Sequence, residues 1–294
     1  MPEDICPICG GSDFRFLFQK DGHGHERCAG CRLIRINPQP GDEELEAIYN
    51  NAKTSYYESW GREEDVYARM KCLTFERLLA MLPPPGKQGL RLLDIGAATG
   101  ILMRVAQAKG YEVYGIEASR PGAEAISRRF GPDRVFNGYF SEDFSHWPGL
   151  GFDVVCLVDL LEHIRRPDLV LAKIHRLLND GGRLVICTMD ASSFSAQLLG
   201  RHWPYYIPQH LYSFSMRNIR ELLHNQGYAL ERLERAAKYL NLEYAVNGLK
   251  SCGQLKCLVK MLDLVRDLLP QSLRRRLVSL PVGQMALTAQ KVRR

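Results

Sequence analysis

From Gly89 onward, short apolar runs alternate with amphipathic stretches along the chain. The runs LRLLDIG, YEVYGIE, FDVVCLVD and RLVICTM have the length of buried strands, and the stretches between them carry apolar residues at helical spacing. Strands that alternate with helices are joined by right-handed crossovers and form a parallel sheet covered on both faces. The pattern therefore predicts an α/β fold for residues 89–294, with Cys156 and Cys187 as small core residues.

A segment at about residues 240–281 interrupts this pattern. Before it, IRELLHNQGYALERLERA predicts a helix, a glycine turn and a strand, and after it MALTAQKV predicts a last strand. The segment is predicted to be a helical insertion that is amphipathic and basic. We expect its apolar face to pack on the protein as a cover. A lid over a hydrophobic substrate, and contact of residues 241–280 with an anionic membrane surface or a lipid-like substrate, remain alternatives.

Residues 41–88 precede the sheet region and are polar and helix-forming. They end in the breaker PPPGKQG at 83–89, which is the clearest domain boundary of the chain. We therefore expect a helical connector between a small N-terminal module and the sheet domain.

Size and composition exclude several classes of protein. The 294 residues leave room for about two domains. No apolar run approaches the ~20 residues needed to cross a bilayer, and the start MPEDICPICG lacks the basic end and apolar core of a signal peptide. We expect a cytoplasmic location, because nine cysteines are an odd number for a secreted disulfide framework. The net charge of +6 is too mild to indicate a partner.

Four cysteines form two CxxC pairs near the start of the chain, CPIC and CAGC, with 18 residues between them. This spacing is typical of a zinc site, because each CxxC turn can present two thiolates to one ion. We expect residues 1–40 to form a zinc ribbon whose Zn²⁺ is structural, since four thiolates leave no coordination position open. The alternative is a set of redox or unrelated thiols. The predicted ligands are Cys6, Cys9, Cys28 and Cys31.

The residues between the two pairs, FRFLFQKDGHGHER, predict a hairpin with its turn at Asp21-Gly22. His23 and His25 could replace one cysteine as a ligand. Because both lie near the predicted tip of the hairpin, we expect them to be exposed to solvent.

The segment LLDIGAATG, residues 92–100, is the most specific motif of the sheet region. A strand ends at Asp94 and Ile95, the glycines at 96 and 100 let the backbone bend past a ligand, and the next helix begins with exposed amides. At the end of the second strand, the carboxylate of Glu117 can accept hydrogen bonds from two ribose hydroxyls. Together these features predict a nucleoside-cofactor site that suits NAD or S-adenosylmethionine.

The glycines read G-x-x-x-G after an Asp, whereas a dinucleotide site reads G-x-G-x-x-G. Here the sequence resembles the class I S-adenosylmethionine-dependent methyltransferases, whose first motif is an acidic residue followed by G-x-G-x-G. Ala98 departs from that motif at its middle glycine. The resemblance continues over FDVVCLVDLLEHIRRPDLVLAKIHRLLNDGGRLVICTMD, which looks like the family's fourth strand, next helix, glycine turn and fifth strand.

This resemblance implies a Rossmann-like sheet of seven strands, the last one antiparallel, with S-adenosylmethionine as the cofactor. It implies that Asp94 orders the glycine loop, that the loop lines the methionine part, and that Glu117 holds the ribose. Residues 139–142 would lie beside the adenine, and the end of the fourth strand would border the cofactor. The implied cofactor-binding residues are Asp94, Gly96, Ala97, Gly100, Glu117, Ala118, Tyr139, Phe140, Asp159 and Leu160.

A zinc-binding N-terminus followed by RINPQP, three tyrosines and a methyltransferase core is also a recognisable order. It resembles the zinc-containing methyltransferases of bacterial secondary metabolism and surface-sugar biosynthesis, the type 11 and 12 group that includes sugar C-methyltransferases. The resemblance implies that the connector closes over the cofactor. Tyr56, Tyr57 and Trp60 would take part in this closure or would only join the two domains.

The segment RHWPYYIPQHLYSF looks like the H-E-H-x-x-Y-F segment of the sugar enzymes, in which a His is taken as the base that removes the acceptor proton. His210 is the residue that aligns with this base, whereas Pro208 and Gln209 replace the other His and the Glu. An imidazole with a pKa of about 6.5 suits proton removal at neutral pH. Capping a helix or bonding a carbonyl is the alternative role for His210.

We hypothesise that Tyr212 and His163 orient the acceptor beside His210, which makes these three the expected catalytic residues. His163 could also face solvent near a helix start, where the preceding Glu162 would favour the positive end of the helix dipole. An apolar wall that excludes water is expected from Trp203, Tyr205 and Tyr206.

The sequence thus predicts an enzyme that transfers a methyl group from S-adenosylmethionine to carbon or oxygen of a small-molecule acceptor, such as a sugar, a polyketide-like or a quinone-like compound. One alternative is a nucleic-acid methyltransferase that grips RNA or DNA with the zinc ribbon. We expect no nucleic-acid partner, because the chain lacks an Asn/Asp-Pro-Pro-Tyr/Phe segment and its basic residues are not interleaved with stacking aromatics. The other alternative is a catalytically silent binding protein of the same fold.

Overall fold

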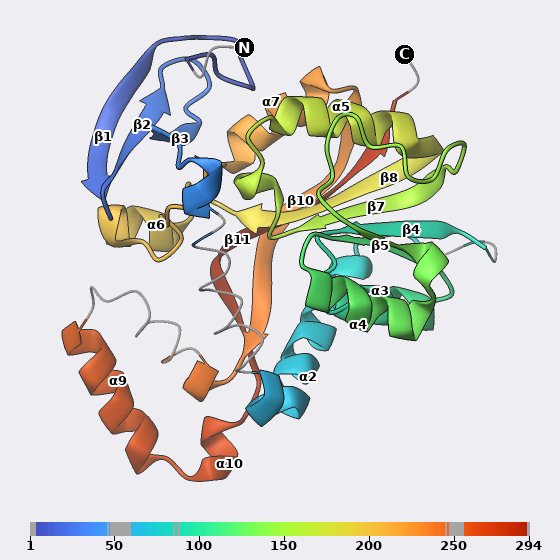
Figure 1. Ribbon diagram of the computed structural model, residues 1–294. Coiled ribbons are helices and arrows are strands. Elements are labelled where there is room, and N and C mark those ends of the chain that lie inside the picture. Colours follow the sequence, from blue (N-terminus) through green and yellow to red (C-terminus); the bar gives the residue numbers. More distant parts are fainter. Residues whose placement is uncertain are drawn as a thin grey trace.

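The computed structural model describes residues 4–45, 47, 60–84, 86, 89–244, 246 and 256–292. A large sheet with helices on both faces forms the body of the molecule, and a smaller sheet that begins at the N-terminus packs against one end of it (Figure 1). Tyr56 and Tyr57, and the side chain of Trp60, lie outside the described part of the structure.

The large sheet has the strand order β10-β11-β8-β7-β4-β5-β6. Strands β8, β7, β4, β5 and β6 are parallel, and β11 is antiparallel to both of its neighbours. The predicted seven-stranded sheet with an antiparallel last strand is therefore confirmed. Its strands are β4 (Arg91–Ile95), β5 (Glu112–Glu117), β6 (Val135–Asn137), β7 (Phe152–Val158), β8 (Leu178–Met189), β10 (Tyr228–Leu240) and β11 (Val278–Lys291).

Helices cover both faces of this sheet, with α5 and α7 on one side and α2, α3 and α4 on the other (Figure 1). The α-helices are α2 (Trp60–Leu79), α3 (Ile101–Ala108), α4 (Arg120–Phe130), α5 (Pro167–Leu177), α6 (Phe194–Leu199), α7 (Met216–Asn225), α9 (Lys256–Leu268) and α10 (Gln271–Arg274). The described residues also form short 3₁₀ helices, which are η1 (Pro132–Arg134), η2 (Leu161–His163) and η3 (Gly200–His202).

The apolar runs of the central strands fill two separate cores. In β4, Leu93 and Ile95 join the core under α5 and α7, whereas Leu92 joins the core under α2, α3 and α4. Successive side chains of a strand point to opposite faces, so a strand that is buried on both faces must be apolar throughout. Cys156 and Cys187 are buried within the second core, which confirms their expected role.

The N-terminal sheet contains β1 (Phe14–Lys20), β2 (His23–Cys28), β3 (Ile34–Asn37) and β9 (Tyr212–Ser213). The first two strands form the predicted hairpin, whose turn residues Asp21 and Gly22 both have positive φ (50° and 84°). The fourth strand, β9, comes from the loop between β8 and α7 and pairs with β3. The small module therefore takes part of its sheet from the large domain.

The expected exposure of the hairpin histidines is wrong. His25 exposes 2% of its surface, stacks on Phe18 with ring centroids 4.6 Å apart, and contacts the edge of Tyr206 at 5.2 Å. The side chain of His23 is 14% exposed and lies 3.2 Å from Glu44. Part of the cover of His25 comes from Tyr206, which lies 181 residues further along the chain, so the local hairpin pattern could not reveal it.

The C-terminal insertion connects the far ends of β10 and β11, outside the part of β11 that pairs with β8. Strands β10 and β11 continue past it as a two-stranded extension, in which Leu240 pairs with Val278. The last strand therefore starts seven residues before the predicted MALTAQKV. The expectation that the apolar face of the insertion packs on the protein is wrong for α9, in which Met261, Leu264 and Leu268 are 55–77% exposed.

Replacing His25 by Phe should reduce the acid sensitivity of the fold. Burial lowers the pKa of His25 to about 4, so between this value and the ordinary 6.5 the unfolded chain binds more protons than the folded one. The stability that neutral His25 contributes is present above about pH 6.5 and is lost as the pH falls to about 4. In urea unfolding, His25→Phe should lose about 2 kcal/mol less than the wild type between pH 7 and pH 5.

The control for this comparison is the same substitution at an exposed histidine, His202→Phe. Equal losses of stability in the wild type and His25→Phe would show that His25 does not contribute to the acid sensitivity.

Candidate active site

The glycine loop after β4 turns sharply through left-handed backbone. Gly96, Ala98 and Gly100 have φ of 80°, 50° and 71°. A Cβ at Gly96 would lie 3.4 Å from two methyl groups of Leu160, and one at Gly100 would lie 3.0 Å from the ring of Phe130. The loop therefore requires glycine at both positions, and it delivers the chain to the first turn of α3.

Glu117 ends β5 directly beside this loop. Its two carboxylate oxygens accept hydrogen bonds from the backbone N–H groups of Ala98 (2.8 Å) and Ser119 (2.7 Å). A carboxylate oxygen can accept more than one hydrogen bond, so both oxygens can also bind hydroxyl groups. The backbone oxygens of Glu117 and Ala118 accept hydrogen bonds from the side-chain amide of Asn137 on β6. These bonds fix the glycine loop and the ends of β5 and β6 as one unit.

Asp94 lies beneath the loop and is 3% exposed. Burial, reinforced by the negative charge of Glu117, raises the pKa of Asp94 to about 7. Both effects disfavour the ionised form of Asp94.

Asp159 stands at the end of β7 with a φ of 51°. Its carboxylate accepts hydrogen bonds from Lys238 Nζ (3.1 Å) on β10 and from Gln284 Nε2 (2.6 Å) on β11. Burial opposes its ionisation, but the charges of Lys238 and Lys71 together with these hydrogen bonds hold the pKa of Asp159 well below its usual range. Asp159 is thus a fixed negative charge at the carboxyl edge of the sheet.

A cleft opens between the glycine loop, the end of β7 and helix α2. Asp94, Gly96, Ala97 and Asp159 line it, together with Lys71 and other residues of α2. The predicted connector helix therefore borders the cleft. Of the other implied cofactor-binding residues, Leu160 lies over Gly96, Tyr139 is 76% exposed, and Phe140 packs on Phe144 at 5.0 Å.

Two of the three predicted catalytic residues lie together. The rings of His163, on η2, and His210, on the loop before β9, contact edge to face with centroids 4.7 Å apart. One ring nitrogen of each histidine and a carboxylate oxygen of Glu162 lie within 4.8 Å of one another. Glu162 is buried, which raises its pKa to about 8, and its Oε2 accepts a hydrogen bond from Thr188 at 2.8 Å. Burial therefore favours the protonated form of Glu162.

The tautomer of His210 follows from its hydrogen bond. Nδ1 lies 2.7 Å from the carbonyl oxygen of Tyr205, and because a carbonyl can only accept, Nδ1 carries the proton and Nε2 carries the lone pair. Burial, assisted by the neighbouring His163, lowers the pKa of His210 to about 3. Burial also lowers the pKa of His163 to about 4. Both rings are therefore neutral at pH 7, and the pKa of His210 departs from the ordinary imidazole value of about 6.5.

The hydroxyl group of Tyr212 is directed to the backbone of Arg165 and not to the two histidines. The Tyr212 hydroxyl donates to the backbone oxygen of Arg165 at 3.1 Å, and the residue pairs with Arg35 of β3. Trp203 and Tyr206 are buried in a cluster that includes residues of the N-terminal module, whereas the ring of Tyr205 lies parallel to that of His210 at 6.3 Å. Of the three aromatic residues predicted to form a wall, Tyr205 is the one that faces the histidine pair.

Sequence reasoning missed Lys238, Gln284 and Lys71, which surround Asp159. Each lies in an ordinary strand or helix pattern. The pairing of β10 with β11 brings Lys238 and Gln284 to Asp159, and the packing of α2 brings Lys71 to the cleft. No local motif marks them.

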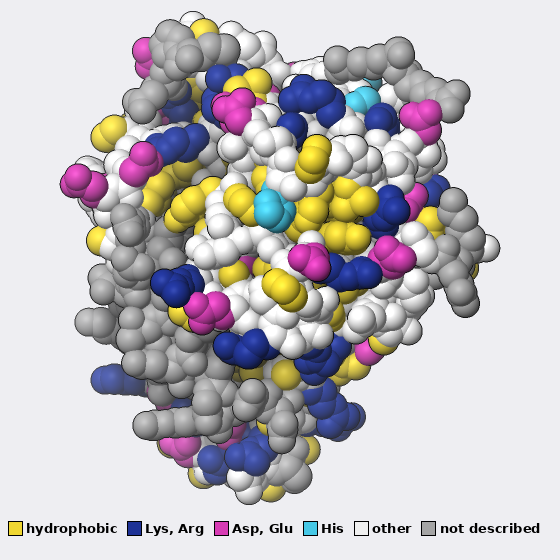
Figure 2. All heavy atoms as spheres, turned by 45° about the vertical axis from the view of Figure 1, so that its right-hand side comes forward, with side chains coloured by type: hydrophobic (Ala, Val, Ile, Leu, Met, Phe, Trp, Pro, Cys, Tyr) yellow, Lys and Arg dark blue, Asp and Glu magenta, His cyan; other side chains and the backbone are white. Residues whose placement is uncertain are grey.

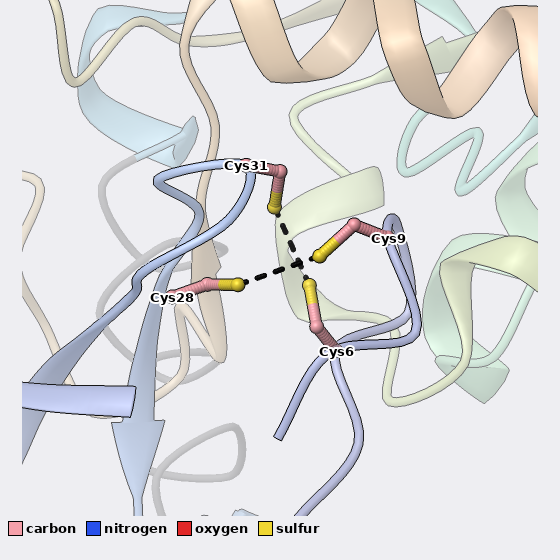
Figure 3. Close-up of side chains that lie close together, drawn as sticks. All are labelled: Cys6, Cys9, Cys28 and Cys31. Carbon is pink, nitrogen blue, oxygen red and sulfur yellow. Dashed lines mark hydrogen bonds between the residues drawn. The ribbon is translucent and has the colours of Figure 1, made fainter. Parts of the chain in front are cut away.

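The four cysteines of the CxxC pairs point toward one another (Figure 3). The Sγ atoms of Cys6 and Cys31 are 3.4 Å apart and those of Cys9 and Cys28 are 3.5 Å apart, well beyond a disulfide bond of about 2.05 Å. A tetrahedral ion with Zn–S bonds of about 2.3 Å has sulfur atoms roughly 3.8 Å apart. The residues present therefore fit a zinc ion with four thiolate ligands.

The comparisons with known proteins agree with this fold. A family model described as a methyltransferase domain matches residues 64–233, which is more than half of the chain. The chain therefore belongs to this family of methyltransferase domains, and its sheet is the Rossmann-like sheet of class I methyltransferases.

The curated relatives include ubiquinone biosynthesis O-methyltransferases. The one from Cereibacter sphaeroides (strain ATCC 17025) is 32% identical over 121 residues, covering 40% of this chain and 49% of the relative. The one from Pseudomonas syringae pv. tomato is 30% identical over 105 residues, covering 35% of this chain and 45% of the relative. The chain spans about half the length of the curated relatives that it matches.

Similar solved structures extend over more of the chain. One is the 1,6-didemethyltoxoflavin N1-methyltransferase of Burkholderia thailandensis, solved with S-adenosylhomocysteine. The match covers 95% of this chain and 100% of that protein, with a TM-score of 0.52 and 16% identity. The match to magnesium protoporphyrin IX methyltransferase from Synechocystis covers 84% of this chain and 99% of that protein, with a TM-score of 0.52 and 15% identity. At these identities the similarity shows the fold alone.

Replacing Ala98 by Gly should stabilise the protein by about 0.5–1 kcal/mol, because left-handed backbone is unfavourable for alanine. Glycine loses more backbone entropy on folding than alanine does, but this loss offsets only part of the gain. Ala97→Gly is the matched control. Ala97 lies outside the left-handed region and is buried, so this change should lower the free energy of unfolding. Chemical denaturation measures both, and a loss of stability in Ala98→Gly would contradict the proposed strain.

Proposed function

We propose that this protein transfers a methyl group from S-adenosylmethionine to an oxygen or carbon atom of a small-molecule acceptor. The observation that carries the proposal is the convergence of the glycine loop, Glu117 and Asp159 at the carboxyl edge of the parallel strands. The buried His210 is near enough to Asp159 for the charge of this carboxylate to favour its protonated form. The cofactor supplies a methyl group that the positive charge of its sulfur already activates.

The residues of the chain bind and orient the reactants. Glu117 holds the ribose hydroxyls, and the backbone of Gly96 and Ala97 lines the methionine part. Asp159 is a carboxylate at the end of β7 that borders the cleft and is held ionised by Lys238 and Lys71. These groups would hold the cofactor beside the acceptor, and positioning of the two reactants is the main requirement of this reaction.

His210 accepts the proton of the acceptor at Nε2 while Nδ1 stays bonded to the Tyr205 carbonyl. The charge of Asp159 favours the protonated imidazole that results. Since burial keeps the pKa of His210 low, its best partner is an acceptor with an acidic proton, such as a phenolic hydroxyl. Together with relatives that are O-methyltransferases by name, this favours oxygen of a quinone-like acceptor over a sugar carbon.

The four-cysteine site holds a structural zinc ion in this proposal, and the support is the fit of the sulfur positions. In the described part of the chain, no helix is both long and apolar enough to cross a membrane. The cytoplasmic location and the absence of a nucleic-acid partner stay predictions.

Binding of S-adenosylhomocysteine should depend on Glu117. Two hydrogen bonds to a charged carboxylate contribute about 3 kcal/mol, so Glu117→Ala should weaken binding roughly 100-fold in calorimetric titration. Glu117→Gln keeps the shape of the side chain and should bind with intermediate affinity. NADH should not bind. Unchanged affinity in a folded Glu117→Ala variant, or tight binding of NADH, would contradict the assignment of the cleft.

Replacing His210 by Asn should lower kcat by about 10²–10⁴-fold and leave the affinity for S-adenosylhomocysteine unchanged. Transfer of a radiolabelled methyl group to a panel of catechols, quinols and nucleotide sugars measures the rate, with the exposed His202→Asn as the control. Because the pKa of His210 is about 3, its protonation should cause no fall in kcat between pH 8 and pH 5. Wild-type turnover by His210→Asn would show that another group is the base.

One zinc ion per chain should be present, and it should be lost in Cys28→Ser but retained in Cys72→Ala, which lies outside the cluster. Elemental analysis measures the metal. Hydrogen exchange of the backbone amides in β3 and β9 should accelerate in Cys28→Ser, because these strands depend on the module. A metal-free protein with protected amides would contradict a structural zinc ion.

A further inference from the structure

The ends of β10 and β11, together with α9 and α10, form an arm that projects away from the large sheet (Figure 1). Apolar side chains are unusually exposed on it. Of thirteen large hydrophobic residues that are exposed in the described part of the chain, seven belong to the arm, with exposed fractions of 42–77%. They are Met261, Leu264, Val265, Leu268, Leu273, Val278 and Leu280.

Helix α9 presents its apolar stripe to solvent. Met261, Leu264, Val265 and Leu268 follow the spacing i, i+3, i+4 and i+7, which places them on one face of the helix. Arg266, on another face, is only 21% exposed and pairs with Asp263 at 2.6 Å. A helix that covers a core has the opposite arrangement, with its charged residues outward and its apolar stripe inward. We therefore expect the exposed stripe of α9 to contact a partner outside the domain.

The charge of the arm indicates the kind of partner. Residues 256–277 contain six Lys and Arg and two Asp, and both Asp pair with Arg266. Lys260, Arg275 and Arg276 are exposed and form no ion pair within the described residues. On the face that Figure 2 shows, Lys and Arg side chains lie across the lower half of the molecule, with acidic side chains among them. The partner surface is therefore both apolar and negatively charged.

We propose that this arm docks on an anionic phospholipid bilayer. The stripe of α9 enters the boundary between headgroups and acyl chains, and the basic residues contact the headgroups, as in amphipathic helices that lie in the plane of a membrane. The root of the arm is close to the candidate active site, because Leu240 is two residues from Lys238, which contacts Asp159. Docking thus brings the end of the sheet that carries the cleft toward the bilayer. The proposal does not depend on methyl transfer.

Flotation of the full-length protein with lipid vesicles tests this proposal. Binding to vesicles of equal parts phosphatidylglycerol and phosphatidylcholine should be at least 10-fold tighter than to phosphatidylcholine alone, and it should weaken as salt is raised from 0.05 to 0.5 M, about the range over which charges become screened. The double variant Leu264→Gln and Leu268→Gln should bind at least 10-fold more weakly. Arg275→Gln combined with Arg276→Gln should lose the preference for phosphatidylglycerol.

Phe16→Gln is the matched control, because Phe16 is an equally exposed apolar residue on β1, far from the arm in sequence. It should bind vesicles like the wild type, and thermal unfolding verifies that each variant is folded. Absence of vesicle binding by the folded wild type, or equal binding by the Leu264/Leu268 variant, would overturn the proposal. Self-association without vesicle binding, abolished in that variant, would instead assign the stripe to a second copy of the chain.

Discussion

The parallel pairing of β4 with β5 and β7 is the constraint on which the candidate site depends. Because Ile95 is in register with Ile116 and Leu157, the three strands end at one level and the residues that follow them meet at one edge of the sheet. Residues with an unfavourable backbone conformation also lie at that edge. Ala98 and Asp159 are left-handed without being glycine, and such strain persists where the surrounding structure enforces it. The hydrogen bonds to Glu117 and from Lys238 provide this enforcement.

The N-terminal module contacts the segment of the large domain that carries His210. The loop between β8 and α7, which carries His210, contributes β9 to the module's sheet, and Ile36 N–H donates to the Leu211 carbonyl at 3.0 Å. Lys20 Nζ donates to the Trp203 carbonyl at 3.1 Å. The cysteine cluster is thus connected to the histidine pair through a few strand hydrogen bonds. The stability of the module and the placement of His210 are consequently linked.

Much of this arrangement is readable from the sequence, because local patterns determine it. The period of the apolar runs predicts the sheet, the glycines and Glu117 predict the loop, and the two CxxC pairs predict the cysteine cluster. Contacts between distant segments are not readable in this way. The burial of His25 under Tyr206, the Lys238–Asp159 pair and the low pKa of His210 all arise from tertiary packing. The outward stripe of α9 is a further case, since its amphipathic period does not tell which side faces solvent.

A crystal structure of the protein soaked with S-adenosylhomocysteine would test the central claim most directly. The account predicts the ribose hydroxyls on the carboxylate of Glu117, the homocysteine part along Gly96 and Ala97, and the sulfur on the side of Asp159 and His210. Ligand bound away from the glycine loop, or bound there with its sulfur turned away from His210, would contradict the account.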